Sequence, residues 1–515
     1  MIKPNNMKKL LFLIPLIFLL FISSTYSQSV ELTDIQKREF RGVFPILNKN
    51  TNSVKGYYSF YVNEKAEAGR RNFVIVIFDE KLDLLNKTSI SISKRSVVDG
   101  AEFDGENFLF IFNDLIKKRR TLITCDSDGN IIKEKHVQES KGSNYNASVY
   151  TSSNGGFYIV MPIREKKTGY SVEKVDKDLN TLWERRFMPN KGFIGVATIE
   201  SGEGMIIMIQ QTKPSLMSKK IGANLVALDD ETGEEEFVYP LYDGNITRQP
   251  SAFAIGSNHE IITAGMYFDG EKWDGKNSDG IFFLKLSADG EEIISTTENW
   301  DEGIQQIIKD GSKKTFTISS KPKVLFHDII VNEAGNYQVI GETFKKSFQL
   351  VSIISKDIIT GRYIGNINSE NAKPITFEIM DFIIFNFDND GEMSGINMIT
   401  KEHTKISCYP PYSRYGGLSL AIKVRDYGWF NYKFMQSATG SEDSKMVSCL
   451  FVQDPYIGIY SFEDGEYSDL ERIPITKKSI RGGGMGVMPG SPGNLGVYIY
   501  SKKEKSLLIY LQDFD

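Results

Sequence analysis

The four histidines and three cysteines of this chain are the side chains best suited to bind a transition metal. A zinc site uses Cys and His side chains at short, regular spacings. None of these residues has such a spacing to another, so we expect no metal site and no cofactor. They are Cys125, Cys408, Cys449, His136, His259, His327 and His403.

The segment Asn386–Gly391 begins like a calcium-binding loop, because Asp and Asn side chains alternate with other residues. In such a loop the twelfth residue is a glutamate, and helices flank the loop. Here the twelfth residue is Asn397, and the flanking residues have the pattern of strands. A hairpin turn is the better interpretation, since Asp, Asn and Gly tolerate positive φ.

Two glycine-containing segments resemble catalytic or phosphate-binding motifs. Gly417–Ala421 is one residue short of a nucleophile elbow, but the histidine of that fold follows the serine, and the last histidine is His403. We therefore reject the elbow and predict that Leu418–Val424 is a strand. Arg481–Gly486 lacks the Lys-Ser/Thr pair of a phosphate-binding loop and is interpreted as a loop between repeats.

The carboxylates, aromatic residues and basic residues of the chain do not single out a catalytic or binding site either. Spacing alone cannot select a catalytic pair among 66 acidic residues, most of which lie in predicted turns. The loop Tyr409–Tyr412 and Tyr415 could stack on a sugar or peptide, although loop packing is the simpler interpretation. Lys117–Arg120 is interpreted as a solvated hairpin tip. The sequence thus identifies no catalytic residue.

The elements that carry these residues are paired strands that recur along the chain. An apolar run ends in an acidic turn and is followed by a second strand, as in Phe73–Asp79 and then Lys81–Leu85. A second kind of turn alternates with the first, with centres near residues 104, 154, 203 and 257. Two hairpins in about 50 residues make four strands, which is the size of a propeller blade.

The sequence therefore predicts an all-β fold, a multi-bladed β-propeller with eight blades, and seven as the alternative. Turns near Asp426–Gly428, near Pro489–Asn494 and before Gly56 complete the count of eight. The last unit lacks an outer strand, and we expect residues Val30–Phe40 to supply it. The N- and C-terminal strands would then close the ring and leave no unpaired sheet edge.

The segments that depart from the hairpin pattern are predicted to be insertions. Residues Asn299–Ile308 are expected to form a short helix on the surface. The three insertions are predicted at Phe268–Asp279, Asn299–Pro322 and Lys345–Pro374.

The first residues are typical of a secretory signal peptide. Two lysines precede the apolar stretch Leu10–Ile22, and small or polar residues follow at Ser23–Gln28. The stretch is shorter than the roughly 20 residues of a membrane-spanning helix. We expect residues 1–27 to be removed, leaving residues 28–515 as one propeller domain with no integral membrane segment. The expected location is the periplasm or the extracellular surface.

Charge and cysteine content restrict the partners and the cross-links. The chain has a net charge of −5, so we expect no nucleic-acid partner and consider a protein or glycan of the cell envelope instead. Three cysteines allow one disulfide, which we expect between Cys408 and Cys449. Cys125 lies in a strand-like run and is expected to be buried.

Several strand and turn segments of the C-terminal third carry a family resemblance: Phe382–Gly391, Gly416–Leu418, Tyr427–Tyr432 and Ser501–Lys505. In these segments the chain resembles an uncharacterised family of secreted bacterial proteins, described only as a domain of unknown function. The resemblance implies a propeller-like fold over the mature chain and export in a Gram-negative bacterium, but no functional residues. From the absence of a catalytic motif we infer a binding or scaffolding module. The alternatives are a polysaccharide hydrolase or lyase with acidic residues at the funnel, and a subunit of an envelope complex.

Overall fold

The computed structural model describes residues 28–514 with internal gaps, so the predicted signal peptide lies outside the described residues. Most of the second and third predicted insertions lies outside them as well. The gaps are 49–52, 64–68, 115, 139–146, 166, 216–220, 257, 272–277, 307–321, 333, 349–374, 410–411, 413–414, 438–443, 451–453, 464–465 and 476–482.

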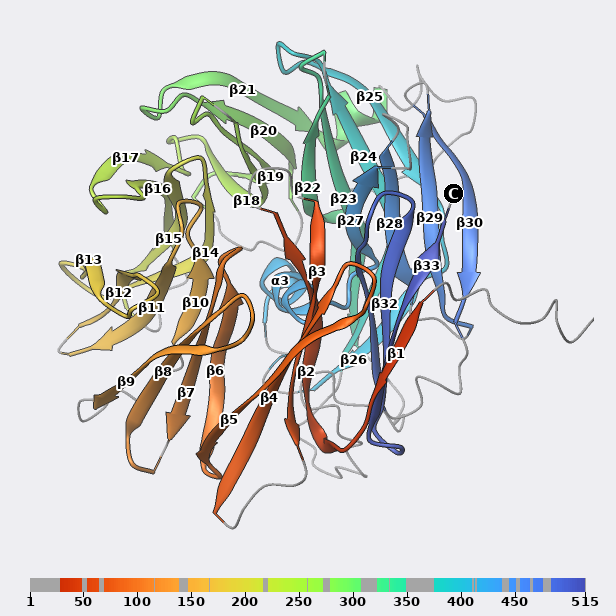
Figure 1. The fold of residues 1–515 in the computed structure, drawn as a ribbon. Coiled ribbons are helices and arrows are strands. Elements are labelled where there is room, and N and C mark those ends of the chain that lie inside the picture. Colours follow the sequence, from red (N-terminus) through yellow and green to blue (C-terminus); the bar gives the residue numbers. More distant parts are fainter. Residues whose placement is uncertain are drawn as a thin grey trace, which may run out of the picture.

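The described residues fold mainly into antiparallel strands, which follow one another in groups of four around a common centre (Figure 1). A single parallel bridge, between Thr168 and Phe193, joins two of these groups into one sheet. We number these groups units 1 to 8. Unit 1 contains β2 (Ile35–Leu47), β3 (Val54–Asn63), β4 (Arg70–Asp79) and β5 (Leu84–Ser93). Unit 2 contains β6 (Ser96–Phe103), β7 (Asn107–Asp114), β8 (Arg119–Asp126) and β9 (Ile131–Gln138). Unit 3 contains β10 (Ser148–Thr151), β11 (Phe157–Arg164), β12 (Thr168–Val175) and β13 (Thr181–Phe187). Unit 4 contains β14 (Phe193–Gly202), β15 (Met205–Lys213), β16 (Gly222–Asp229) and β17 (Glu235–Pro240).

The second half of the chain repeats this arrangement. Unit 5 contains β18 (Ile246–Ile255), β19 (Ile261–Asp269), β20 (Gly280–Leu286) and β21 (Glu292–Asn299). Unit 6 contains β22 (Lys323–Val331), β23 (Tyr337–Phe348), β24 (Ile375–Phe387) and β25 (Met393–Ile399), and β26 (Thr404–Cys408) also pairs with β24. Unit 7 contains β27 (Tyr432–Ser437), β28 (Ser444–Leu450), β29 (Tyr456–Glu463) and β30 (Glu466–Pro474). Unit 8 contains β31 (Gly484–Pro489), β32 (Asn494–Ser501), β33 (Ser506–Asp513) and, from the other end of the chain, β1 (Ser29–Leu32).

The terminal strands pair, but over fewer residues than predicted. Ser29 lies opposite Tyr510, and Leu32 lies opposite Leu507, so β1 is the outer strand of unit 8. Residues from Ile35 onward already belong to β2, the first strand of unit 1. Of the predicted segment Val30–Phe40, only its first residues therefore pair with the C-terminal strand.

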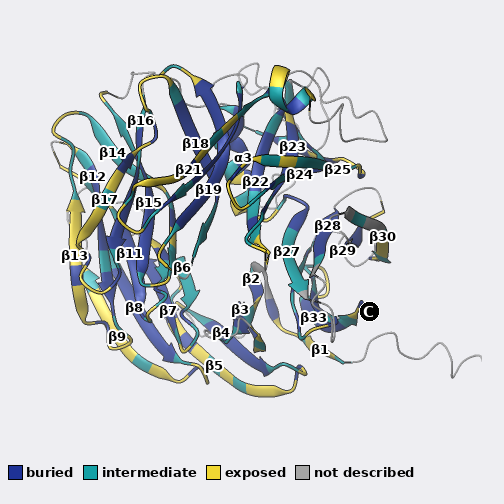
Figure 2. Ribbon diagram, turned by 90° about the horizontal axis from the view of Figure 1, so that it is seen from above, coloured by how far each residue is buried: buried dark blue, intermediate teal, exposed yellow. Residues whose placement is uncertain are grey.

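Consecutive units are held together by buried apolar side chains. Middle strands such as β3, β4 and β7 are buried along most of their length, whereas the outer strands β5, β9 and β13 are largely exposed (Figure 2). Each hydrophobic cluster between units combines residues of two neighbours; one joins Phe60 and Ile75 of unit 1 to Phe108 and Phe110 of unit 2. Another joins unit 8 to unit 1. The arrangement is β-propeller-like.

A recurrent acidic turn joins the third and fourth strands of a unit. In unit 6 the Oδ1 atom of Asp388 accepts the backbone N–H groups of Asp390 at 3.1 Å and Glu392 at 2.8 Å, and Gly391 has a φ of 81°. This confirms the hairpin-turn interpretation of Asn386–Gly391. The same turn begins at Asp79, Asp126 and Asp176.

These turns also attach each unit to the one before it. A Cβ atom on Gly391 would lie 2.1 Å from the Cγ2 atom of Ile294 in unit 5, so the turn packs tightly on β21. The hydroxyl of Thr296 donates to the carbonyl of Gly391 at 2.7 Å. Glycine is needed at this position both for its positive φ and for this close approach.

The prediction for Leu418–Val424 was wrong: these residues belong to a helix, α3 (Gly417–Asp426), which lies in the central space between the sheets (Figure 1). Its buried residues include Gly417, Leu420, Ala421 and Val424, whose spacing is that of one helix face rather than of a strand. The predicted hairpin turn at Asp426–Gly428 is the end of this helix. The first hairpin of unit 7 lies later, between β27 and β28.

Two further predictions were wrong in part. Residues Trp300–Ile304 form a helical turn, η1, but Trp300 and Ile304 are buried rather than on the surface, and the indole N–H of Trp300 donates to Ser278 Oγ at 2.9 Å. Gly484–Gly486, predicted as loop, belongs to β31. Among the described residues, no helix is long and apolar enough to span a membrane.

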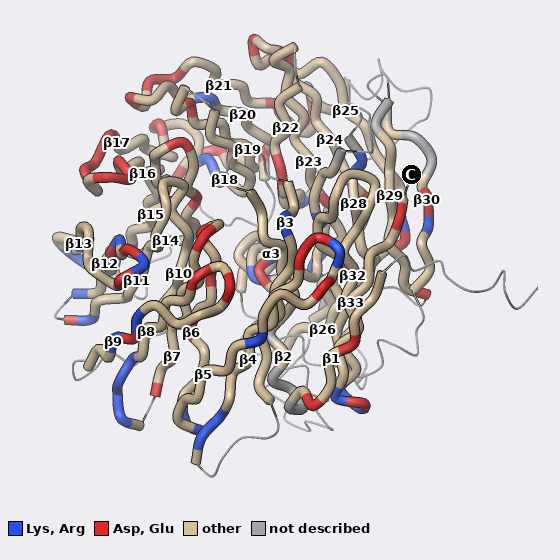
Figure 3. Tube along the Cα trace, in the orientation of Figure 1, with Lys and Arg blue, Asp and Glu red and all other residues tan. Residues whose placement is uncertain are grey.

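The two ends of the strands differ in charge. We call "upper end" the end with the first and third hairpin turns of each unit, and "lower end" the end with the second hairpin turns and the connections between units. Acidic residues gather at upper-end turns such as those beside β17, β21 and β25. Basic residues gather at the lower ends of β4 and β5 and at the turn between β7 and β8 (Figure 3). The acidic turns described above account for much of this separation.

Candidate functional site

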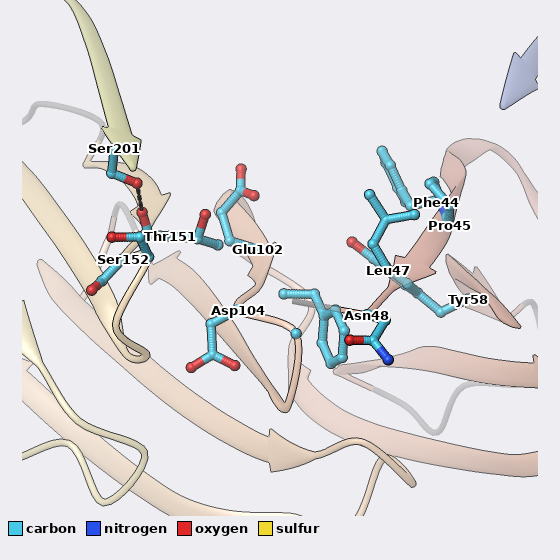
Figure 4. Close-up of a pocket in the computed structure, with 13 residues that line it drawn as sticks. Phe44, Pro45, Leu47, Asn48, Tyr58, Glu102, Asp104, Thr151, Ser152 and Ser201 are labelled. Atoms are coloured by element: carbon cyan, nitrogen blue, oxygen red, sulfur yellow. Dashed lines mark hydrogen bonds between the residues drawn. The ribbon is translucent and has the colours of Figure 1, made fainter. Parts of the chain in front are cut away.

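A pocket of about 410 Å³ opens at the upper end, where the inner strands of units 1 to 4 reach their first turns (Figure 4). Because each of these strands contributes a short segment just before its turn, the pocket depends on the packing of four consecutive units. It is lined by Phe44, Pro45, Leu47, Asn48, Tyr58, Glu102, Phe103, Asp104, Gly105, Thr151, Ser152, Ser153 and Ser201.

The pocket has one apolar wall and one polar wall. On the apolar side, Phe44 is 41% exposed. Its ring stacks on that of Tyr58, with the ring centroids 5.1 Å apart. Tyr58 in turn packs edge-on against Phe108 of unit 2, which fixes its position. The opposite wall consists of hydroxyl groups and two carboxylates (Figure 4).

Glu102 is the ionisable group of the pocket whose environment is most unusual. Its half-buried side chain comes from β6 and stands between Thr151 and the apolar wall (Figure 4). Burial raises the pKa of Glu102 from 4.5 to about 7. Near neutral pH this carboxyl group can therefore either donate or accept a hydrogen bond.

Asp104 lies two residues further along but serves the fold. Its Oδ1 atom accepts the backbone N–H groups of Glu106 at 2.9 Å and Asn107 at 2.7 Å, and its Oδ2 atom accepts that of Gly156 at 2.7 Å. The carboxylate of Asp104 points away from that of Glu102 (Figure 4). Asp104 thus closes its own turn and fixes the turn of unit 3, leaving Glu102 as the carboxyl group that faces the pocket.

A second carboxyl group lies near the upper end of the inner strand of unit 4. Glu200 of β14 is exposed, yet the surrounding protein still raises its pKa by desolvation, with Arg425 at the end of α3 acting in the opposite direction. Burial also raises the pKa of Tyr150 in β10, opposed by a hydrogen bond with Ser148. The negative charges of Asp426, Glu200 and Glu102 raise the pKa of Tyr150 further. All three carboxylates therefore lie close enough to interact electrostatically with the phenol group of Tyr150.

These groups lie near the upper ends of three neighbouring inner strands. Glu102 and Tyr150 each lie two residues before the first residue beyond their strand, Asp104 and Ser152, and Glu200 lies two residues before Gly202, the last residue of β14. None of the three was selected from the sequence. Alignment of the first hairpin turns would have shown that all three lie close to the upper ends of their inner strands.

Two other clusters of buried charges hold units together. Asp230 of unit 4 is fully buried, and its carboxylate accepts from Lys174 Nζ and Ser152 Oγ of unit 3, both at 2.9 Å. Glu342 of unit 6 pairs with Lys401 Nζ at 3.0 Å and with His327 Nε2 at 3.2 Å. The burial of both carboxylates removes them from contact with a ligand.

The other residues selected from the sequence do not converge. His136 contacts Thr121 and Glu134, His259 lies in a turn with a φ of 60°, and His403 lies beside Glu378. His327 belongs to the buried cluster with Glu342. Within the described part of the chain, no three His, Cys, Asp or Glu side chains are arranged to hold a metal ion.

The expected Cys408–Cys449 disulfide is not formed. Both sulfurs are free and buried, because Cys408 in β26 packs in the core beside α3, whereas Cys449 in β28 packs between units 7 and 8. Cys125 is buried in β8, as predicted. Tyr412 packs against the core beside α3, and Tyr415 is 40% exposed with its ring centroid 5.8 Å from that of Tyr412.

The comparison with family models gives one match. Residues 7–514 match a family described as "Family of unknown function (DUF6770)". The chain belongs to this family. The resemblance to an uncharacterised, propeller-like family is thereby confirmed. No curated protein matches the chain.

Several solved structures are similar to this DUF6770 member over most of its length. A quinohemoprotein alcohol dehydrogenase from Comamonas testosteroni has 11% identity and a TM-score of 0.43, covering 95% of this chain and 76% of that chain. A europium-containing methanol dehydrogenase has 9% identity and a TM-score of 0.41, covering 95% and 96%. The polysaccharide lyase Uly1 has 10% identity and a TM-score of 0.38, covering 95% and 100%. These likenesses assign no activity to the chain.

Proposed function

We propose that this protein is an exported binding module and that the upper-end pocket holds a glycan. The observation that carries the proposal is the pairing, in one pocket, of an exposed aromatic ring with a half-buried carboxyl group. A sugar ring has apolar C–H faces and a rim of hydroxyl groups, so it needs both kinds of wall. Phe44 supplies the first, and Glu102 with the neighbouring serine and threonine hydroxyls supplies the second.

The test is a glycan array with the purified chain, followed by calorimetry with the best-bound glycan. Phe44→Ala and Glu102→Gln should each weaken binding by at least about tenfold, corresponding to roughly 1.4 kcal/mol. The controls are Tyr415→Ala, which removes an equally exposed ring elsewhere, and Glu106→Gln, which neutralises an exposed carboxylate on the same hairpin. A glycan whose affinity is unchanged by both pocket variants would refute the proposed site.

A polysaccharide hydrolase or lyase is the second candidate function. It is favoured by Glu102 and Glu200, two carboxyl groups with raised pKa values that both act on Tyr150. A protonated Glu102 is suited to general acid catalysis near neutral pH. Release of reducing or unsaturated ends from a bound polysaccharide, lost in Glu102→Gln, would favour this function over binding alone.

The proposal includes the architecture and the export of the chain. We infer that the eight units are the blades of one propeller and that pairing of β1 with β33 closes it, since unit 8 shares a hydrophobic cluster with unit 1. Lys8, Lys9 and the apolar run after them support removal of residues 1–27. Intact-mass analysis of protein exported by a Gram-negative host should find Gln28 as the first residue, and retention of Met1 would contradict it.

A further inference from the structure

The lower end of four consecutive units presents an exposed basic surface, which we call the basic arc. The units are 8, 1, 2 and 3, which are joined to one another by shared hydrophobic clusters. Among the described residues, the exposed acidic side chains at these turns are Asp34, Glu504 and Glu165, of which Glu165 pairs with Arg186 at 2.9 Å. The exposed basic residues of the arc are Arg70, Lys94, Arg95, Lys117, Lys118, Arg164, Lys167, Arg186 and Lys503.

An apolar side chain projects from the middle of this arc. Ile116, at the hairpin tip between β7 and β8, is 63% exposed, which is the highest exposure among the large hydrophobic residues of the described chain. It is followed directly by Lys117 and Lys118. A single exposed isoleucine is common on protein surfaces, but Ile116 lies at a tip beside two lysines, so whatever these lysines approach can also remove the isoleucine from water.

Hydrogen bonds to the backbone N–H and C=O groups of Ile116, Lys117 and Lys118 hold this hairpin tip in place. Asp114 Oδ1 accepts the backbone N–H groups of Ile116 at 3.2 Å and Lys117 at 3.0 Å. From the neighbouring strand β9, the side-chain amide of Gln138 donates to the carbonyls of Lys117 at 3.3 Å and Lys118 at 3.0 Å. Little conformational entropy is therefore lost when Ile116 and the lysines engage a partner.

We propose that the basic arc docks the protein on an anionic lipid bilayer, with Ile116 inserted among the headgroups. Lys and Arg side chains are attracted to anionic headgroups, and an apolar side chain is stabilised at the boundary with the acyl chains. A soluble polyanion would satisfy the charges but leave Ile116 in water. The acidic turns of the upper end are repelled by the same bilayer, so the charge separation also sets the orientation.

The experiment is flotation of the chain with phosphatidylcholine vesicles containing about 30% phosphatidylglycerol, compared with vesicles of phosphatidylcholine alone. The unmodified chain should bind the anionic vesicles only. K117E/K118E should lower the partition coefficient by at least roughly 25-fold, since each basic residue near an anionic surface contributes about fivefold. Ile116→Ser should lower it by roughly fivefold or more.

Matched controls use residues away from the lower end. K87E/K133E makes the same change of charge on the exposed outer strands β5 and β9, and Ile131→Ser removes an isoleucine that is 48% exposed at the upper end of unit 2. Both should bind within about twofold of the unmodified chain, because their side chains do not reach the bilayer.

Three outcomes would overturn the proposal. One is equal binding to both kinds of vesicle, and another is binding to neither. The third is binding to anionic vesicles that Ile116→Ser leaves unchanged and that soluble heparin abolishes, which would assign the arc to a polyanion instead. These measurements involve no residue of the pocket, so their failure is independent of the glycan proposal.

Discussion

Replacement of Glu102 by glutamine should change how the stability of the protein depends on pH. The pKa of Glu102 is about 7 in the folded protein, against an ordinary value of 4.5. Between these two values the folded chain holds a proton that the unfolded chain has lost. A raised carboxyl pKa therefore makes the free energy of unfolding fall as pH rises from about 4.5 to about 7, and the loss is complete above that window.

The size of this effect follows from the two pKa values. At 1.36 kcal/mol per pH unit, the gap between them corresponds to roughly 3 kcal/mol. Glu102 is only half-buried and its pocket is open to solvent, which screens the charged form, so we expect about 1–2 kcal/mol. Glu102→Gln removes the ionisable group and should lose this pH dependence.

The assay is urea unfolding of the native chain, Glu102→Gln and Glu106→Gln at about pH 5 and about pH 8.5, with the slope m checked for constancy. The native chain and Glu106→Gln should lose about 1–2 kcal/mol more between the two pH values than Glu102→Gln does. Identical pH profiles for Glu102→Gln and the native chain would refute the reasoning, because burial of this carboxyl group would then cost nothing.

Four further predictions concern the fold. Lys401→Met should destabilise the protein by about 3–5 kcal/mol in urea unfolding, because Glu342 is left buried without its cation, and adding Glu342→Gln should recover part of this loss. Deletion of residues 28–34 should lower the free energy of unfolding by about 2–4 kcal/mol in a single transition, and an unchanged melting temperature would show that β1 is dispensable. Gly391→Ala should cost about 1–3 kcal/mol. Gly395→Ala should change stability by less than about 0.5 kcal/mol, because its φ is ordinary and the added Cβ would meet Asn386 Nδ2 at 3.7 Å, a normal contact distance. A reductant should leave the melting temperature unchanged, since the three thiols are already free.

The strands could be predicted from the sequence because the information for them is local. An apolar run followed by Asp, Asn and Gly forms a hairpin whatever lies around it, and the turn at Asp388 shows why, since its carboxylate accepts the N–H groups of its own turn. Helix α3 was missed because its short apolar stretch suits a strand as well as a helix. Its packing against units 5 and 6 decides between them.

The pocket could not be predicted because its residues come from four separate units. Phe44 and Thr151 are far apart in the sequence, and only the packing of consecutive units brings them to one cavity. The raised pKa of Glu102 depends on burial, which local sequence does not reveal. The disulfide prediction failed for the same reason, because proximity of Cys408 and Cys449 in the sequence says nothing about which cores their strands enter.

The pairing of β1 with β33 has a consequence for how the chain folds. Strand β1 is made long before its partner β33, so unit 8 cannot form until β33 has been synthesised. Until β33 is made, β1 and one edge of β32 lack their partner, and such edges aggregate readily. Contacts between residues so distant in sequence also form slowly. A factor that keeps the nascent chain unfolded until its last strand is available would therefore raise the yield of native protein more than a factor that accelerates the folding of single hairpins.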